Sequence, residues 1–570
     1  MNAQLRDVGI PKAPTQQNGL DMLSRMLSDA MGRARSTAPR VAAPQPSPQV
    51  QAASDQDYPD KLDAKMLRIV FVCGLACIMA VLDSTVVAVA QGTFVTQFNS
   101  DQAVVSWTVA AYMLAFATVI PITGWAADRF GTKRLFIGSV LLFMVGSLLC
   151  AIAPNIVLLI IFRVVQGIGG GMLMPVSFVI LTHEAGPKRV GRLMAIGGIP
   201  ILLGPIGGPI LGGWLVGAYG WQWIFLINLP IGLLAVVLAA LTFPKDRPAP
   251  AEALDIVSVL LLPPGVTLFL AGVSSVPAQG TILNRYVLAP TIAGLVLVAA
   301  FVFHSFRVQH PLIDLRLFKN RVVTHANLAL LVFGAPFVGV GLLVPSYFQL
   351  VMHQTPMESG MHLVPVGLGA VLTMPLAGAF MDKHGPGKVV LVGLPAMAIG
   401  LGIFTYGVAT QAAFSPVLLI GLSVMGLGVG CTTSPLSAAV LQSLAPHQVA
   451  RGTTLVTVNQ QVSGSIGAAL MTVILTQLFN HNESLITANK LVAAQQQSSG
   501  RRLPVESADS AWKGLGPDFG ASVAQAFSHA YTTVFVVAVA LIVVTIIPAA
   551  FLPMKRPEPP VDPEPAAPAA

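Results

Sequence analysis

Long apolar segments separated by short polar connections run through most of this 570-residue chain. Each segment is close to the ~20 residues that a helix needs to cross a bilayer, and the alternating pattern of barrel strands is absent. We therefore predict an all-α polytopic membrane protein with about fourteen transmembrane helices. The predicted spans are residues 67–91, 105–127, 134–153, 155–182, 193–217, 223–243, 254–274, 287–306, 323–351, 360–381, 388–409, 414–441, 451–478 and 530–553.

Composition supports this class of protein. Only 10% of the residues are charged, 54% are hydrophobic and the mean hydropathy is +0.75, whereas about 25% of the residues of a soluble protein are charged. The formal net charge of +8 would suggest a nucleic-acid partner for a soluble domain. Here the basic residues lie in connections at one membrane face, so we expect a lipid bilayer around the chain and no nucleic acid.

The same basic residues orient the spans. With the N-terminus inside, the inner connections hold most of the lysines and arginines, and the short outer connections hold only Arg285. The positive-inside rule then places both termini in the cytoplasm, and we expect the inner (plasma) membrane of a bacterium. The polar segment 479–529 becomes a long outer loop.

Two sequence repeats divide the chain. GWAADRFGTKR (124–134) after the second span is echoed by GAFMDKHGPGK (378–388) after the tenth, and GIGGGMLMP (167–175) is echoed by GLGVGCTTSP (426–435). Such internal symmetry is typical of transporters built from two bundles around a central cavity. The predicted parts are a cytoplasmic tail with a short amphipathic helix (1–65), a six-helix bundle (66–243), two inserted helices with a linker (244–322), a second six-helix bundle (323–553) and a cytoplasmic tail (554–570).

The repeated polar loop is the first candidate site. A glycine, an acid, a base and a second glycine recur in the same order, and glycine permits a tight turn or a close helix contact. The alternative is a plain loop whose charges only set the topology. The candidate hinge or latch residues are Gly124, Asp128, Arg129, Gly131, Lys133, Arg134 and Asp382.

Two charged residues lie well inside predicted spans, Asp83 in the first and Arg163 in the fourth. A charge at this depth costs several kcal/mol unless it is paired or hydrated, so it indicates function. Both lie ~12 Å below the outer surface, which allows an ion pair or a shared water cavity. A static pair that only fixes helix packing is the alternative. Leu422 falls where Arg163 would repeat, so we assign the charge chemistry to the first half.

Six stretches together carry a family resemblance. They are LDSTVVAVA (82–90), GWAADRFGTKR (124–134), RVVQGIGGGMLMP (163–175), GGIPILLGPIGGPILGGWL (197–215), WQWIFLINLPIG (221–232) and HPLIDLRLFKNR (310–321). In these stretches the chain resembles the fourteen-helix drug:proton antiporters of the major facilitator superfamily, the EmrB/QacA-type multidrug exporters. The resemblance implies the major facilitator fold and proton-coupled export of hydrophobic or amphipathic drugs or toxic metabolites by alternating access. A proton symporter or uniporter for a small metabolite is the alternative.

The resemblance also implies roles for particular residues. Asp83 and Arg163 are expected to couple protons to transport. Gly204, Pro205, Gly207 and Gly208 match the antiporter motif, with a generic packing face as the alternative. The chain departs from the family pattern at Ala88 and at Gln91-Gly92. The candidate residues of a substrate cavity are Trp107, Tyr112, Gln166, Met172, Phe337, Gln460 and Gln461.

Other chemistry is not expected from the sequence. The glycines at 167–171 precede no GK[ST] and so predict no phosphate-binding loop. We expect no enzyme activity, no metal and no cofactor, with the proton gradient as the energy source. Four cysteines within apolar spans predict no disulfide. In two-membrane bacteria, exporters that this chain resembles often work with a periplasmic adaptor and an outer-membrane channel. The segment 479–529 would offer a surface for such partners; a passive linker or an extracellular lid is the alternative.

Overall fold

The computed structural model describes residues 63–185, 189–246, 255–279, 283–308, 311–445, 448–487 and 517–555. The amphipathic helix expected in the N-terminal tail and most of the outer loop 479–529 lie outside these ranges. Within them, thirteen helices are long and apolar enough to cross a membrane. The 29-residue helix α7 adds a further long apolar helix. The prediction of an all-α chain with about fourteen spans therefore agrees with the structure.

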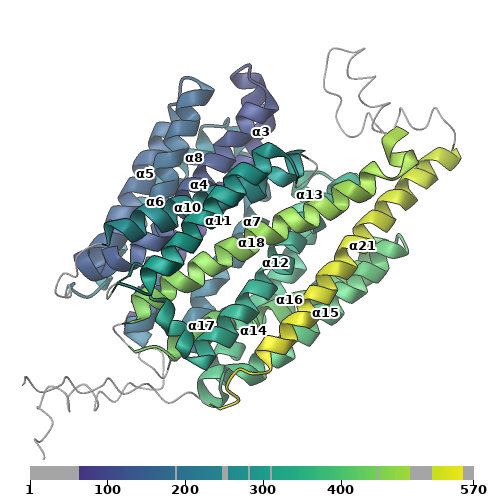
Figure 1. Ribbon diagram of the computed structural model, residues 1–570. Coiled ribbons are helices and arrows are strands. Elements are labelled where there is room, and N and C mark those ends of the chain that lie inside the picture. The colour runs from purple at the N-terminus through teal and green to yellow at the C-terminus, as the bar shows by residue number, and fades with distance from the viewer. Residues whose placement is uncertain are drawn as a thin grey trace, which may run out of the picture. The chain divides into compact units, whose positions relative to one another are not determined.

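The helices follow the predicted spans in order (Figure 1). The first half contains α3 (Ala64–Gln97), α4 (Gln102–Phe130), α5 (Thr132–Ala151), α6 (Ile156–Ala185), α7 (Val190–Ala218), the short α8 (Trp223–Leu226) and α9 (Asn228–Thr242). The inserted pair is α10 (Ile256–Gln279) and α11 (Arg285–Ser305), followed by the 3-10 turn η1 (Leu315–Lys319).

The second half repeats this order with small irregularities. It contains α12 (Arg321–Leu350), α13 (Pro356–His362), α14 (Val364–His384), α15 (Pro386–Ala409), the π-helical turn η2 (Phe414–Leu418), α16 (Leu419–Gly430), α17 (Thr433–Gln442), α18 (Val449–Asn480) and α21 (Pro517–Ala549). The predicted twelfth span is thus built from η2, α16 and α17. It is interrupted at Cys431 and Thr432, after the glycine-rich stretch.

Polar caps decide where several of these helices begin. Asp63 accepts a hydrogen bond from the first amide of α3, and the side chains of Asn284 and Asn320 accept one from the second amide of α11 and α12. Thr355 and Glu358 form a complete capping box at α13. Between the caps the segments are helical because a bilayer offers the backbone no hydrogen-bond partner outside its own helix, and their side chains are mostly apolar because they face lipid or other helices.

The two halves share one packing plan. Helix α6 lies between α4 and α5, and α16 lies between α14 and α15. A side chain at Gly167 would collide with the Tyr112 carbonyl on α4, and one at Gly426 would collide with the Val366 carbonyl on α14. The glycine-rich repeats therefore allow the fourth helix of each half to approach its neighbours at backbone distance.

The halves meet through α7 with α14 and through α4 with α18. The inserted pair α10–α11 packs beside this boundary, because α10 contacts both α4 and α18. Thr118 on α4 and Thr267 on α10 share a hydrogen bond of 2.5 Å. In Figure 1 the teal helices α10 and α11 and the light-green α18 run between the purple and blue helices of the first half and the yellow α21 of the second.

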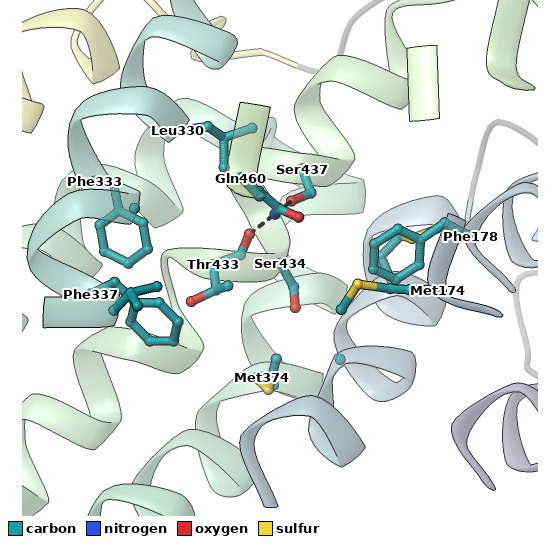
Figure 2. Close-up of a pocket in the computed structure, with 14 residues that line it drawn as sticks. Met174, Phe178, Leu330, Phe333, Phe337, Met374, Thr433, Ser434, Ser437 and Gln460 are labelled. Atoms are coloured by element: carbon teal, nitrogen blue, oxygen red, sulfur yellow. Dashed lines mark hydrogen bonds between the residues drawn. The ribbon is translucent and has the colours of Figure 1, made fainter. Parts of the chain in front are cut away.

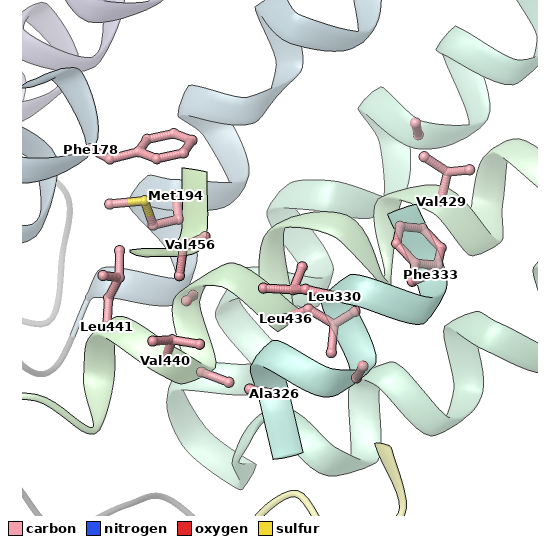
Figure 3. Close-up of a cluster of buried hydrophobic side chains, with 14 of the residues drawn as sticks. Phe178, Met194, Ala326, Leu330, Phe333, Val429, Leu436, Val440, Leu441 and Val456 are labelled. Atoms are coloured by element: carbon pink, nitrogen blue, oxygen red, sulfur yellow. The ribbon is translucent and has the colours of Figure 1, made fainter. Parts of the chain in front are cut away.

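One hydrophobic core runs across this boundary (Figure 3). Phe178 of α6 and Met194 of α7 come from the first half, while Leu330 and Phe333 of α12 and Val456 of α18 come from the second. In a bilayer such contacts stabilise by close packing rather than by removal of apolar surface from water. Phe178, Met194, Leu330 and Phe333 also line the pocket that is described below.

Candidate functional site

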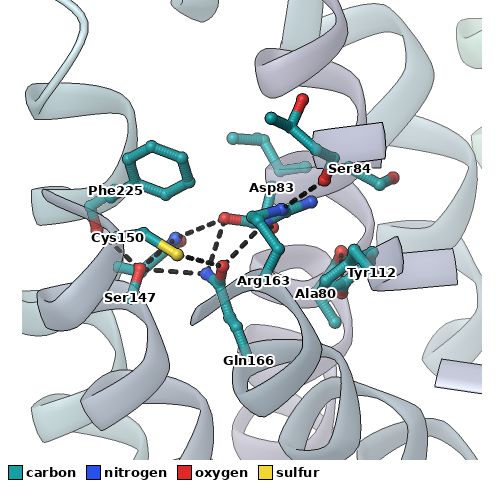
Figure 4. A network of polar contacts seen from close by, with 12 residues as sticks. Ala80, Asp83, Ser84, Tyr112, Ser147, Cys150, Arg163, Gln166 and Phe225 are labelled. Carbon is teal, nitrogen blue, oxygen red and sulfur yellow. Dashed lines mark hydrogen bonds and ion pairs between the residues drawn. The ribbon is translucent and has the colours of Figure 1, made fainter. Parts of the chain in front are cut away.

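Asp83 of α3 and Arg163 of α6 form an ion pair in the middle of the first half (Figure 4). Both side chains are fully buried, with no exposed surface. The guanidinium lies over the ring of Tyr112, 4.1 Å from its centroid. The ion pair that their equal depth allowed is thus present, and it is enclosed by protein.

The two carboxylate oxygens of Asp83 have different partners. Oδ1 accepts hydrogen bonds from Nε2 of Gln166 at 2.8 Å and from Nδ2 of Asn228 at 2.9 Å. Oδ2 accepts from Nη1 of Arg163. The two amides also donate to the Ser147 hydroxyl, each at 3.0 Å, and Ser147 donates to the Phe225 carbonyl. The carboxylate therefore joins α3, α6 and α9 directly, and the two amides connect it to α5 through Ser147.

The guanidinium of Arg163 also makes hydrogen bonds besides the one to Asp83. Its Nε donates to the Thr108 carbonyl on α4 at 2.9 Å, and Nη1 also donates to Oε1 of Gln166 at 2.7 Å. Nη2 is buried and has no hydrogen-bond partner within the described part of the chain. Removing one partner of such a pair leaves an uncompensated buried charge, which costs about 3–5 kcal/mol.

The structure changes the assignment of two predicted cavity residues. Tyr112 and Gln166 face into the first half and belong to the ion-pair network rather than to a cavity between the halves. Asn228 and Ser147 were missed by sequence reasoning. Asn228 lies in the stretch WQWIFLINLPIG, and a buried amide within an apolar span was the available signal.

The two polar loops have the same turn but different partners. Gly131 and Gly385 follow α4 and α14 with φ of 88° and 89°, a conformation that favours glycine. In each loop the chain that follows the last helix of that half returns to the turn. Asp246 accepts from the amides of Lys133 and Arg134 at 2.9 and 3.1 Å, and the Pro553 carbonyl accepts from the amide of Gly387 at 3.1 Å.

Asp382 instead joins the two halves. Its carboxylate accepts from the amides of Gly191 and Arg192, the second and third residues of α7, at 2.9 and 3.0 Å. Gln442 of α17 donates to the same carboxylate at 3.0 Å. We call this contact the α14–α7 cap. A carboxylate at a helix N-terminus is stabilised by the free amides and by the helix dipole.

The remaining loop residues lie at the end of α4. Gly124 lies against α18, where an added side chain would meet the Ala450 carbonyl and the Thr454 hydroxyl. Asp128 is half-buried and Arg129 is exposed in the last turn of α4. Lys133 Nζ donates to the carbonyls of Ala240 and Phe243 at the end of α9. Thus each loop brings the end of one helix onto a helix start in the other half.

The predicted antiporter motif packs α7 onto α3. A side chain at Gly204 would meet Val81, and one at Gly208 would meet Thr85, whose hydroxyl hydrogen-bonds the Gly204 carbonyl at 3.2 Å. Gly207 has more room, and the side chain of Pro205 is not among those described. Two of the glycines therefore form a close contact beside the helix turn that carries Asp83.

A pocket lies between the halves (Figure 2). It encloses about 800 Å³ of empty space, open solvent included. Phe337 and Gln460, two of the predicted cavity residues, line it. Trp107, Met172 and Gln461 are not among its lining residues, and Trp107 is 51% exposed near the far end of α4. The lining residues are Met174, Phe178, Met194, Gly198, Leu330, Phe333, Gly334, Phe337, Val338, Met374, Thr433, Ser434, Ser437 and Gln460.

Two related helical halves around such a pocket define a membrane transporter. The chain belongs to the Major Facilitator Superfamily, whose model matches residues 72–468. This confirms the predicted family and fold.

Two relatives are informative. The chain is 58% identical over 505 residues to the multidrug resistance protein B homolog of Mycobacterium tuberculosis H37Rv, covering 88% of this chain and 93% of that protein. It is 30% identical over 431 residues to the multidrug export protein EmrB of Escherichia coli K12, covering 74% and 83%. Among solved structures, the human organic anion transporter MFSD10 aligns with a TM-score of 0.54 at 15% identity, over 84% of this chain and all of that one. That similarity shows the shared fold.

The α14–α7 cap predicts a direct effect on how the halves meet. Asp382→Ala removes the acceptor for two α7 amides, and loss of such a cap costs about 1 kcal/mol, or roughly fivefold in an equilibrium. In a cysteine-free background, a cysteine replacing buried Ala195 on α7 should then react about fivefold faster with a membrane-impermeant thiol reagent.

Asp246→Ala is the matched control, because it removes the same kind of cap within one half. Labelling at position 195 should stay at the wild-type rate in that variant. Equal labelling in wild type and Asp382→Ala would show that the cap does not hold the halves together.

Proposed function

We propose that this chain exports hydrophobic or amphipathic small molecules across a plasma membrane in exchange for protons. The observation that carries the proposal is the separation of two sites. A titratable carboxylate is paired inside one half, and an uncharged pocket lies between the halves. The two relatives named above, a multidrug resistance protein and a multidrug export protein, support export.

The orientation follows from charge. The connections after α4 and α14 and before α12 carry lysine and arginine, so this end of the bundle faces the cytoplasm. Helix α3 begins and α21 ends at the same side, which supports a cytoplasmic position for both ends of the described bundle. The α14–α7 cap then closes the cytoplasmic side, and substrate leaves the pocket towards the outside by relative motion of the halves.

The geometry assigns the proton to one oxygen. Oδ1 of Asp83 already accepts two amide N–H groups, so a proton there would face donors only. Oδ2 has Arg163 as its partner, and a proton there ends the ion pair. Arg163 is then a buried cation that has lost its counter-charge, which is costly. Protonation therefore favours a state in which α6 moves or water reaches the guanidinium.

Asp83→Asn should abolish export driven by a proton gradient. The amide keeps the size of the side chain and loses the titratable oxygen. Downhill equilibration of substrate in proteoliposomes should continue, which separates coupling from folding and binding. Uphill export by Asp83→Asn at the wild-type rate would refute the coupling role.

Asp255→Asn is the matched control, since Asp255 lies just before α10 and pairs with His304 at 2.9 Å. Burial raises the pKa of Asp255, but hydrogen bonds from Ser258 and His304 outweigh it and keep the pKa below its usual value. Asp255 therefore stays ionised over the assay range and should be dispensable for coupling.

Asn228 positions the carboxylate, and its removal should move the pH profile. Asn228→Leu has a similar volume but leaves Oδ1 with a single donor. Because a hydrogen bond to a charged group is worth about 1.5–3 kcal/mol, the charged carboxylate is less stabilised and the pH of half-maximal export should rise by about one unit. The measurement is the initial rate of gradient-driven export as a function of pH, from about pH 5.5 to about pH 9.

Few titratable groups face Asp83 from the helices packed around it. They are Arg163 from α6, Tyr112 from α4 and Cys150 from α5. Helix α9 contains no titratable residue, and the one in α7, Arg192, lies at the α14–α7 cap. A shifted pH profile in Asn228→Leu is therefore assigned to the Asp83 network.

Asn327→Leu in α12 is the control for that variant, because Asn327 is buried and bonds to Val323 and Asn459 rather than to a carboxylate. Its pH profile should match that of wild type. A rate loss without a pH shift in Asn228→Leu would show a purely structural role for Asn228.

We also propose a periplasmic adaptor, with an outer-membrane channel beyond it, as partners of the segment 479–529. The segment contains four basic residues that membrane topology does not require, and most of it lies outside the described residues. Deleting residues 488–516 should reduce drug resistance of intact two-membrane cells while leaving export in proteoliposomes unchanged. Equal loss in both assays would assign the segment to the transport cycle itself.

A further inference from the structure

The described residues that line the pocket between the halves include no ionisable side chain. Ten of the fourteen are apolar or glycine, and the other four are Thr433, Ser434, Ser437 and Gln460. The ion pair of Asp83 and Arg163 is fully enclosed within the first half and does not line the pocket. A ligand in this pocket therefore has no counter-charge beside it.

The apolar walls differ in shape and mobility. Phe333 and Phe337 on α12 lie nearly parallel, with ring centroids 5.5 Å apart and an angle of 20° between the planes. Met174 of α6 lies across the pocket from both rings in Figure 2, and Met194 of α7 and Met374 of α14 also line the pocket. Aromatic rings offer a flat, rigid surface, and methionine side chains adapt to ligands of different outline. Together they favour a flat aromatic ligand.

The polar residues form one strip, made by α17 and α18 (Figure 2). The hydroxyls of Thr433 and Ser437 donate to backbone carbonyls at 3.1 and 3.3 Å, so towards the pocket they act as acceptors. Gln460 uses one N–H for the Ser437 hydroxyl at 3.0 Å, and its carboxamide has a second N–H. The strip can therefore bind one or two neutral groups, such as a carbonyl or a hydroxyl.

The sizes of two free-energy terms decide whether the pocket binds neutral or charged ligands better. An unpaired charge in a site of low polarity costs several kcal/mol. A cation over the Phe333 and Phe337 rings would regain about 0.5–2 kcal/mol. The loss exceeds the gain, so a permanent cation binds less well than a neutral molecule of the same shape. Anions are disfavoured for the same reason, and a weak acid would enter in its neutral form.

We propose that this pocket selects uncharged, flat aromatic molecules that carry a carbonyl or hydroxyl group, with Gln460 as the residue that recognises that group. The proposal rests on the export function proposed above and specifies its substrate class. It predicts that a permanent positive charge on an otherwise identical ring system reduces binding by at least about tenfold, which corresponds to 1.4 kcal/mol.

The test uses the purified full-length chain and a matched pair of probes, a neutral coumarin dye and its trimethylammonium derivative. Equilibrium binding should favour the neutral dye by at least about tenfold. Gln460→Leu should weaken binding of the neutral dye by about fivefold, because the carbonyl loses a neutral hydrogen-bond donor. Gln461→Leu is the control, since Gln461 is the next residue on α18 and does not line the pocket. Its affinity for the dye should stay within about twofold of wild type.

A second variant distinguishes a specific effect on ligand binding from a general loss of folding. Phe337→Leu keeps an apolar side chain and removes one face of the stacked pair. It should lower affinity for the flat dye more than for a neutral aliphatic ketone of similar size, a difference that misfolding does not produce. Equal binding of the neutral and cationic dyes, or no effect of Gln460→Leu, would overturn the proposed substrate class.

Transport of the same dyes in proteoliposomes separates this proposal from the export function. Selective binding without gradient-driven export would refute proton-coupled export and support the selectivity of the pocket. Gradient-driven export of both dyes at equal rates would support export and refute the selectivity.

Discussion

The first half is organised by the cost of holding Asp83 and Arg163 away from water. Neither charge has exposed surface, so each must find its partners within the protein. Gln166 and Asn228 each donate a hydrogen bond to one oxygen of the carboxylate, and the hydroxyl of Ser147 accepts a hydrogen bond from each of these amides. Because these contacts come from four helices, displacing any one of these helices exposes part of a buried ion pair. This constraint favours motion of the whole half over separate motion of its helices.

The second half keeps the packing plan and replaces the chemistry. Leu422 of α16 is fully buried where the fourth helix of the first half carries Arg163. Aromatic side chains fill the interior instead, with Tyr347 against Tyr531 at 5.5 Å and Phe404 against Phe535 at 5.4 Å between ring centroids. The repeats thus agree where backbones must approach, in the glycine-rich helices and the polar turns. They differ where the first half holds the buried ion pair of Asp83 and Arg163.

The helices and the ion pair could be predicted because both rest on strong physical signals. Apolar length marks a span, and an isolated charge within a span requires a partner. The direction in which the side chains of Tyr112 and Gln166 point could not be predicted. Helices that are apolar on nearly all faces have little hydrophobic periodicity to show which face is buried. Asn228 was missed because an uncharged amide within a span is a weaker indication of a functional site than a charged side chain. The α14–α7 cap joins residues 191 positions apart, and the local pattern around Asp382 contains no sign of its partner.

Helix α7 connects the parts of the site that lie apart. The ion pair and the pocket both include residues of α6, but Arg163 and Met174 are eleven positions apart, which is ~16 Å along a helix. The two sites are therefore separate within one helix. Three contacts lie along α7. Gly204 and Gly208 pack against α3 beside Asp83, and Met194 lines the pocket. At the start of the helix, the Gly191 amide donates to the Asp382 carboxylate.

In the proposed cycle, a movement of α3 relative to α6 after protonation of Asp83 would be transmitted to α7, because Gly204 and Gly208 pack closely on α3. The same helix then changes the pocket wall and the α14–α7 cap together, because all three contacts lie along one helix of 29 residues. This is a continuous series of packed groups between the Asp83–Arg163 ion pair and the α14–α7 cap. Under the proposed export cycle, coupling would depend on the stiffness of α7 and on the small residues that keep it close to α3.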